Sequence, residues 1–266
     1  MSTSRTPWAS ARDQLHEQRR RDALRRYYLH ITAKCVAVGV ALAVAIGLTI
    51  ILQTRAAASG PVVAPAGAAG DDGLVIPVGR PQAPVVLTVY EDVRCPGCAQ
   101  LERALRATVN RLEDEGRVRV DYHLLSFVDR IVGGKGSKVA ANALAAAQEA
   151  GRFREFHDVL FAHHPAEESM DVFADREFLL RLADQVPGLR SAEFDKAVAD
   201  GTHSGWVQAV QRRFDEQSVL QGTPAVVLDG ENLVSDQDHL LTPERLLQLV
   251  DQAAAGKEAP GTPTSP

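Results

Sequence analysis

The chain has 266 residues, of which 45% are hydrophobic and 24% are charged, so it can bury the core of one large domain or two ordinary ones. Its net charge of −5 at pH 7 is unevenly spread, because residues 1–34 carry eight Lys and Arg against three Asp and Glu. The rest of the chain is acidic. The basic excess therefore lies outside the expected folded region, which argues against a nucleic-acid partner.

The N-terminal region has the pattern of a membrane anchor. Arginines cluster between Arg19 and Arg26, and an apolar run over residues 31–52 follows, with Lys34 as its only charge. This run is long enough for a single transmembrane helix. The positive-inside rule then places residues 1–30 in the cytoplasm as a basic segment, and the remaining chain outside. We expect a single-pass protein of the cell membrane, held in the lipid bilayer by this helix. A cleaved signal peptide is the alternative, which the long leader and long apolar run disfavour.

Low-complexity segments flank the expected domain. Residues 53–73 are rich in Ala, Gly, Pro and Val without a helical or strand period, so they predict a flexible linker. Residues 255–266 contain Pro, Thr and Ser and predict a disordered tail. The folded domain is expected over residues 74–254.

This domain begins with alternating strand and helix signals. Val85–Tyr90 is a continuous β-branched and aromatic run, typical of a strand buried on both faces. Apolar residues at helical spacing follow Cys95 as far as Leu112. Alternation over Val118–Leu124 then predicts a second, half-buried strand.

A helical block interrupts this pattern before it resumes. Helical periodicity covers about residues 135–217, and Gly133–Gly136 predicts the hinge into this insertion. Ala225–Asp229 returns to a strand pattern, and Pro243 opens a last helix. The order β-α-β, helical block, β-β-α predicts the α/β class.

Three cysteines are too few for a disulfide-stapled scaffold. Cys35 falls in the apolar run, where we expect it to pack as a small hydrophobic residue. Cys95 and Cys98 form a C-x-x-C pair, which can bind zinc, close a structural disulfide or exchange electrons with other thiols. A structural zinc site needs four ligands and the sequence has no second cysteine pair, so no metal site is expected.

The position of the pair favours redox chemistry. Cys95 stands between a strand and a helix, with Pro96 at the favourable first helical position. The helix N-terminus stabilises a thiolate at Cys95 and lowers its pKa, which makes it the attacking or leaving sulfur. Cys98, one turn inside the helix, is placed to resolve a mixed disulfide. Cys95 and Cys98 are therefore the predicted catalytic residues.

The histidines and the tryptophan of the helical block are expected to have packing or surface roles. His157, His163 and His164 lie in the helical block without an evident partner, so surface or packing roles are expected. Trp206, Val210 and Phe214 share one helical face, which predicts a place in the core.

The sequence resembles the DsbA-like branch of the thioredoxin superfamily over about residues 74–254. The resemblance rests on Tyr90–Cys98, on the helical insertion, and on Gly222-Thr223-Pro224 before a strand. It implies a thioredoxin-like fold with an inserted helical subdomain, here preceded by a transmembrane helix. It also implies a cis Pro224 beside the cysteines. The residues that it places at the substrate-binding surface are Pro96, Gly97, Thr223 and Pro224.

The chain departs from that family at two positions. Members often carry an acid six residues before the first cysteine, where this chain has Val89. Strongly oxidising members often carry histidine where this chain has Gly97. Asp92 matches a family acid, but capping of nearby backbone is at least as good an explanation as catalysis, and neither Glu91 nor Asp92 enters the predicted catalytic set.

The expected function is disulfide exchange with proteins outside the cytoplasmic membrane, in the oxidising direction and without a cofactor. The resemblance implies protein thiols and disulfides as substrates and a quinone-linked membrane disulfide oxidase as the reoxidising partner. Two alternatives stay open. One is a reductase or isomerase of the same fold, and the other is a redox-inactive tethered peptide-binding module.

Overall fold

The computed structural model describes residues 61–167, 169–217, 220, 222–234 and 241–258, together with Arg21, Val44 and Gly47. Among these residues, no helix is both long and apolar enough to cross a membrane. The predicted transmembrane helix over residues 31–52, and the basic segment before it, lie outside the described residues apart from those three positions. The chain divides into two compact units, Met1–Ala57 and Ala58–Pro266, and the fold below is that of the second.

A five-stranded mixed sheet forms the centre of the domain. The strands are β1 (Ile76–Gly79), β2 (Val85–Glu91), β3 (Val118–Leu124), β4 (Ala225–Leu228) and β5 (Glu231–Asn232), in the order β1-β3-β2-β4-β5. β2 and β3 run parallel, and the other neighbours are antiparallel. The central position of β2 explains its continuous apolar sequence, because both of its faces are covered.

Helices cover both faces of the sheet. α2 (Pro96–Asp114) and α9 (Pro243–Glu258) pack on the face that carries Leu87 and Val89. On the opposite face, the ring of Phe214 from α8 (Ser204–Asp215) lies 5.5 Å from that of Tyr90. Successive β2 side chains therefore alternate between two helical layers. α9 extends to Glu258, so residues 255–258 of the predicted tail belong to a helix, and residues 259–266 lie outside the described residues.

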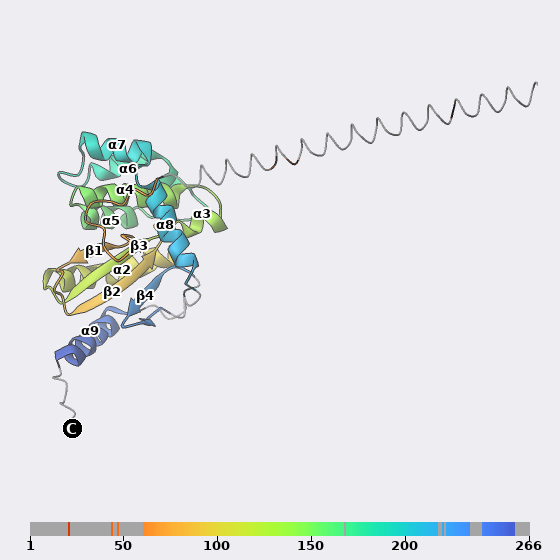
Figure 1. Cartoon of the computed structure of the whole chain (residues 1–266). Helices are drawn as coiled ribbons and strands as arrows, with labels where there is room; N and C mark the ends of the chain where they lie inside the picture. Colours follow the sequence, from red (N-terminus) through yellow and green to blue (C-terminus); the bar gives the residue numbers. More distant parts are fainter. Residues whose placement is uncertain are drawn as a thin grey trace, which may run out of the picture. The chain divides into compact units, whose positions relative to one another are not determined.

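The predicted helical insertion is present between β3 and β4. Figure 1 shows its helices gathered at one end of the domain, with α9 at the other end. Besides α8, the insertion contains α3 (Phe127–Ile131), α4 (Gly136–Glu149), α5 (Phe153–Ala162), the 3₁₀ turn η1 (Val172–Ala174), α6 (Arg176–Ala183) and α7 (Ala192–Asp200). Its core is continuous with that of the sheet. The face of α8 with Trp206, Val210 and Phe214 is buried, as predicted.

The alanine-rich helix α4 is the centre of the insertion. It contacts α5, α7, α8 and η1, because alanine side chains allow neighbouring helices to approach closely. Asn142, buried among these alanines, donates from Nδ2 to the carbonyl oxygen of Ala197 at 3.1 Å. Its Oδ1 accepts from the backbone N–H of His203 at 2.7 Å. One polar side chain thus joins α4 to the connection between α7 and α8.

The segment before β1, which the sequence predicts as a flexible linker, is hydrogen-bonded to the insertion. The Trp206 indole Nε1 donates to the carbonyl oxygen of Gly73 at 2.7 Å, and His203 Nδ1 is hydrogen-bonded to the carbonyl oxygen of Val63 at 2.9 Å. Buried polar side chains need such partners, and the segment supplies its backbone to them. These hydrogen bonds attach Val63 and Gly73 of the segment to the insertion, a contact that the composition of residues 61–73 did not indicate. Residues 53–60 lie outside the described residues.

Candidate active site

Cys95 occupies the N-cap of α2, at the junction that the sequence predicted. Its backbone N–H donates to the carbonyl oxygen of Asp92 at 2.9 Å, which forms the turn after β2. Its own carbonyl oxygen accepts from the N–H of Ala99 at 3.1 Å, and Pro96 begins the helix. The unpaired N–H groups of the first helical turn therefore lie close to the Cys95 sulfur.

The surroundings of Cys95 favour its thiolate. The hydrogen bond from the Cys98 thiol has the largest effect and lowers the Cys95 pKa, whereas burial raises it. The Thr223 side chain and the N–H groups of Cys98 and Gly97 lower it further, so the pKa falls from 9.0 to about 6. Burial raises the pKa of Cys98 well above its ordinary value, and the neighbouring Cys95 adds to this effect. At neutral pH the pair thus consists of a reactive thiolate and a protonated thiol.

The loop before β4 places a cis proline beside this pair. The Thr223–Pro224 peptide bond is cis, as the resemblance implied. The Cys95 thiol donates to the carbonyl oxygen of Thr223 at 3.3 Å. A Cβ atom built on Gly97 would stand 3.0 Å from Cδ of Pro224. The structure therefore brings Gly97, Thr223 and Pro224 together around Cys95, and Pro96 is exposed at the same turn.

This arrangement of a C-x-x-C pair at a helix N-terminus, facing a cis proline, agrees with the family comparison. A family model described as Thioredoxin matches residues 72–252, which is most of the chain. The chain belongs to the thioredoxin family.

The domain is similar in structure to several solved proteins, and disulfide oxidoreductases are among them. Reduced DsbA from Mycobacterium tuberculosis is 23% identical, with a TM-score of 0.56, and the match covers 69% of this chain and 99% of that one. Reduced DsbG from the same organism is 24% identical, with a TM-score of 0.58, and the match covers 73% of this chain and 98% of that one. Oxidised BdbD from Bacillus subtilis is 18% identical, with a TM-score of 0.58, and the match covers 73% of this chain and 97% of that one. These likenesses confirm the predicted thioredoxin-like fold with its helical insertion.

The curated relatives are much longer proteins. Na(+)/H(+) antiporter NhaA 3 from Salinispora tropica is 33% identical over 152 residues, which cover 57% of this chain and 21% of the antiporter. Na(+)/H(+) antiporter NhaA 1 from Salinispora arenicola is 36% identical over 124 residues, which cover 43% of this chain and 18% of the antiporter. The chain thus spans about a fifth of the length of these relatives.

In this thioredoxin-family domain, Asp92 holds the active-site turn together. Its buried carboxylate accepts the backbone N–H of Arg94 at 2.9 Å and that of Val128 at 2.8 Å. Burial nevertheless raises the Asp92 pKa to about 7, although these hydrogen bonds act in the opposite direction. The capping role considered for Asp92 is therefore present, and it connects the turn to α3.

Arg94, directly before Cys95, fastens the turn to the insertion. Its side chain is 1% exposed, and Nη1 donates to Asp129 at 2.6 Å and to the carbonyl oxygen of Gly133 at 3.0 Å. Asp171 lies 3.2 Å from the same nitrogen. Both aspartates also accept N–H groups at the start of α4. The predicted hinge at residues 133–136 is thus folded around the Arg94 guanidinium.

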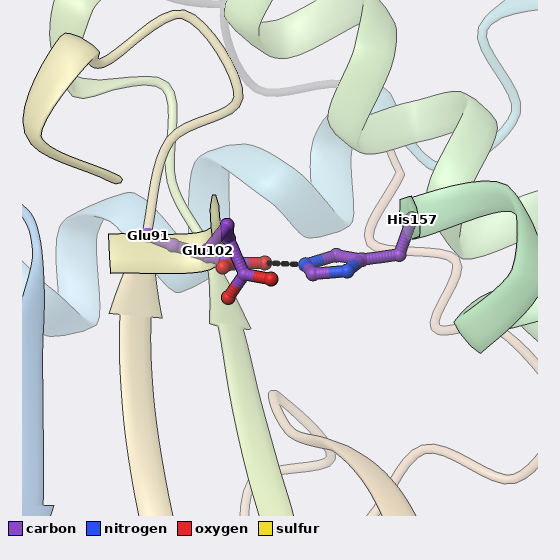
Figure 2. A group of neighbouring side chains, drawn as sticks. All are labelled: Glu91, Glu102 and His157. Carbon is purple, nitrogen blue, oxygen red and sulfur yellow. Dashed lines mark hydrogen bonds and ion pairs between the residues drawn. The ribbon is translucent and has the colours of Figure 1, made fainter. Parts of the chain in front are cut away.

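A second buried polar group lies on the α2 side of the sheet and contains Glu91, Glu102 and His157. Figure 2 shows the Glu91 carboxylate and the His157 ring directed at each other, with Glu102 beside them. Glu91 Oε1 is 2.7 Å from His157 Nε2, and both residues are 2% exposed. The expectation that His157 lacks a partner was therefore wrong.

The charges of this group are strongly coupled. Burial lowers the His157 pKa, but the negative charges of Glu91 and Glu102 outweigh it and raise the pKa to about 10. Burial raises the Glu102 pKa to about 7, against the opposing effect of His157. Glu91 also contributes to the raised pKa of Cys98. The polar group and the buried thiol therefore influence each other electrostatically.

The other two histidines have different positions. His163 is exposed, and its Nδ1 is hydrogen-bonded to the carbonyl oxygen of Val159 in its own helix at 2.9 Å. His164 lies beside the backbone of Arg94 and Cys95, and burial lowers its pKa despite these contacts. It therefore borders the active site, which its sequence position did not indicate.

The sequence does contain signals for the buried group that the predictions missed. Side chains alternate along β2, so Glu91 lies on the same face of the sheet as Val89. Members of the family often carry an acid at the position of Val89, and here the acid is two residues later. Glu102 is four residues after Cys98 on the inner face of α2. His157 is four residues from both Phe153 and Phe161, which are buried. Glu102 and His157 are thus both on helical faces that pack toward the core.

Proposed function

We propose that the chain is an extracytoplasmic protein thiol-disulfide oxidoreductase, held at the cell membrane by residues 31–52, that oxidises protein thiols through Cys95 and Cys98. One observation supports this proposal above all. The Cys95 sulfur, with its pKa lowered to about 6, lies 3.3 Å from the Thr223 carbonyl oxygen beside the cis Pro224, while Cys98 is only 1% exposed. Cys95 is itself 7% exposed, so of the two sulfurs it is the more accessible to an incoming sulfur.

In the proposed reaction, a substrate thiolate attacks Cys95 Sγ of the disulfide form, and the bond to Cys98 breaks. Cys98 leaves with the electron pair and takes up a proton, as its raised pKa favours. A second substrate thiolate then attacks the substrate sulfur of the mixed disulfide. Cys95 leaves as a thiolate, the substrate gains a disulfide, and the enzyme carries the two electrons.

Substrate binding is assigned to the turn and the loop that face each other. Pro96 is exposed, and Gly97 leaves the approach to Cys95 free of a side chain. Thr223 and Pro224 present backbone from the opposite loop, where an extended peptide can pair with it. Reoxidation is assigned to a quinone-linked membrane disulfide oxidase. The antiporter names of the curated relatives support a site of action at a membrane.

Trapping of mixed disulfides tests the proposal. In cells that express the full chain, the Cys98→Ser variant should accumulate disulfide-linked adducts with other proteins, because its resolving thiol is missing. The Cys95→Ser/Cys98→Ser variant is the matched control and should form none. If the single variant also captures nothing, disulfide exchange is ruled out and a redox-inactive peptide-binding module explains the fold better.

The reduction potential tests the direction of the reaction. Equilibration of the purified chain with glutathione buffers should give a value nearer to the roughly −120 mV of a strong oxidant than to the −270 mV or so of thioredoxin. The stabilised Cys95 thiolate is the reason, since it favours the reduced protein. A value at or below that of thioredoxin would instead identify a reductase.

A further inference from the structure

We propose that Glu91, Glu102 and His157 form a binding site for a divalent transition-metal ion, with zinc as the best chemical match. The three side chains come from β2, α2 and α5, and each offers one ligand atom. These atoms all lie within 4.8 Å of one another. The site includes neither cysteine of the C-x-x-C pair.

The ligand types and the charge suit zinc. One imidazole nitrogen and two carboxylate oxygens are the protein ligands of one class of zinc site, which leaves a fourth position open. Two carboxylates and a neutral imidazole carry two negative charges, which a divalent ion balances. An ion pair with the two glutamates would need only a cation, which a lysine could supply. A histidine at this position can also become neutral and bind a metal through its ring nitrogen, which a lysine does less readily.

Binding requires the three side chains to rearrange and the imidazole to lose its proton. Zinc bonds of about 2.0–2.2 Å place neighbouring ligand atoms roughly 3.3 Å apart in a tetrahedron. The 2.7 Å contact between Glu91 Oε1 and His157 Nε2 must therefore lengthen by a few tenths of an ångström, and any pair that lies near the 4.8 Å limit must close by more than about 1 Å. The proton shared between these two atoms passes to solvent, because metal ions bind the deprotonated imidazole.

A carboxylate also lies near the second ring nitrogen of His157, beyond hydrogen-bond distance. His157 Nε2 faces the two glutamates, whereas Nδ1 faces Asp158, whose Oδ1 is 3.8 Å away. Asp158 is fixed in turn by Nδ2 of Asn110 at 3.1 Å and by Nε of Arg106 at 3.2 Å. A carboxylate behind the second ring nitrogen is the usual support of a metal-bound histidine.

Glu102 gives the site a connection to solvent. Its side chain is 13% exposed, whereas Glu91 and His157 are buried. It lines a groove of about 360 Å³ with Arg103, Arg106, Ala107, Phe161 and Ala162. Besides His157, Glu102 interacts with Arg106, whose Nε is 3.6 Å from the carboxylate, a long contact that an arriving metal ion can replace. The ion would therefore enter from the Glu102 side.

Zinc titration of the disulfide form tests the proposal. The full chain, purified in mild detergent, oxidised and stripped with a chelator, is titrated with zinc chloride by calorimetry. Oxidation matters because a Cys95–Cys98 disulfide cannot contribute thiolate ligands. We expect binding of about one ion per chain, and X-ray absorption at the zinc edge should show nitrogen and oxygen ligands without sulfur.

Two glutamate variants on the same helix provide the comparison. Glu102→Gln should weaken zinc binding by more than about tenfold, as loss of a ligand or its support generally does. Glu113→Gln is the matched control, because Glu113 is also buried on α2 and pairs with Arg154 outside the group. Its affinity should equal that of the unchanged chain. Since Glu102 is partly exposed, its variant is expected to fold.

Two results would overturn the proposal. The first is an oxidised chain that binds no zinc at stoichiometric concentration, which would make the group a buried ion pair only. The second is equal zinc affinity of the Glu102→Gln and Glu113→Gln variants, which would place the metal elsewhere. Asp158→Asn adds an independent measurement, because it leaves the three ligands in place and should still reduce the affinity.

Discussion

The Cys95 sulfur lies 3.3 Å from the Thr223 carbonyl oxygen, although 128 positions separate the two residues in sequence. The register of the sheet brings them together. β2 and β4 are antiparallel with Tyr90 opposite Ala225, so the chain leaves β2 at the same edge where it enters β4. The turn with the cysteines and the loop with Pro224 therefore meet at that edge, so the candidate active site depends on the pairing of β2 with β4.

The first prediction concerns the titration of Cys95. In the reduced protein, the rate of alkylation of this thiol should rise with pH and reach half of its maximum near pH 6, where the thiolate forms. Cys98→Ala should move this midpoint upward, because the hydrogen bond from Cys98 is the largest influence that lowers the Cys95 pKa. Cys98→Ser keeps a donor and should shift it less. Equal midpoints in all three proteins would contradict this assignment.

The same titration makes the stability of the reduced protein depend on pH. Because the folded pKa is about 6 and the ordinary value is 9.0, the thiolate stabilises the reduced fold above pH 6. Each pH unit between these values adds about 1.4 kcal/mol, and the whole contribution is lost as the pH falls through 6. Urea unfolding should show this trend in the difference between the unfolding free energies of the reduced and the oxidised chain, because Asp92, Glu102 and His157 titrate in both forms.

The second prediction concerns the contact between Gly97 and Pro224. Gly97→Ala would place a Cβ atom 3.0 Å from Cδ of Pro224, so the loop must shift by a few tenths of an ångström. We expect a higher Cys95 pKa and exchange with a model dithiol that is several-fold slower. Gly222→Ala is the matched control, since its Cβ would have no neighbour within 4 Å. Equal rates for the two variants would show that the loop yields without consequence.

Local sequence patterns were sufficient to predict the strand, turn and helix around Cys95, because each is set by neighbouring residues. The position of Pro224 beside the pair followed from the family resemblance. Arg94 and His157 were beyond such reasoning, since their partners come from elements far along the chain that only the packing of the insertion brings close. Periodicity shows which helical face is buried, but it does not show which buried polar side chains face each other.

The segment before β1 illustrates a different limit. Its Ala, Gly and Pro composition is that of a flexible linker, and composition measures only what a segment can do on its own. Trp206 and His203 are buried polar side chains of α8 and its N-cap, and their hydrogen bonds to Gly73 and Val63 depend on tertiary structure. Sequence reasoning predicted the burial of Trp206 and had no means of finding its partner.

The third prediction concerns Arg94. Arg94→Ala would leave Asp129 and Asp171 without their shared guanidinium, and loss of one partner of a buried ion pair costs about 3–5 kcal/mol. Urea unfolding should show this loss, and Arg94→Lys should recover part of it through its charge. As a control, Arg130→Ala removes an exposed pair with Asp215 and should cost less than about 1 kcal/mol. Equal losses for Arg94→Ala and Arg130→Ala would contradict a connecting role for Arg94.

The fourth prediction tests the attachment of residues 61–73 to the insertion. Trp206→Phe keeps the aromatic packing and removes the Nε1 hydrogen bond to Gly73, which should cost about 1 kcal/mol. Because this bond fastens the segment, its amide protons should exchange faster and protease should cut it sooner, whereas the β2 core stays protected. Arg213→Ala, which removes an exposed contact of 3.5 Å with Asp72 in the same segment, should change neither rate measurably. Unchanged exchange over residues 61–73 in Trp206→Phe would mean that other contacts hold the segment, and that its order does not depend on the indole.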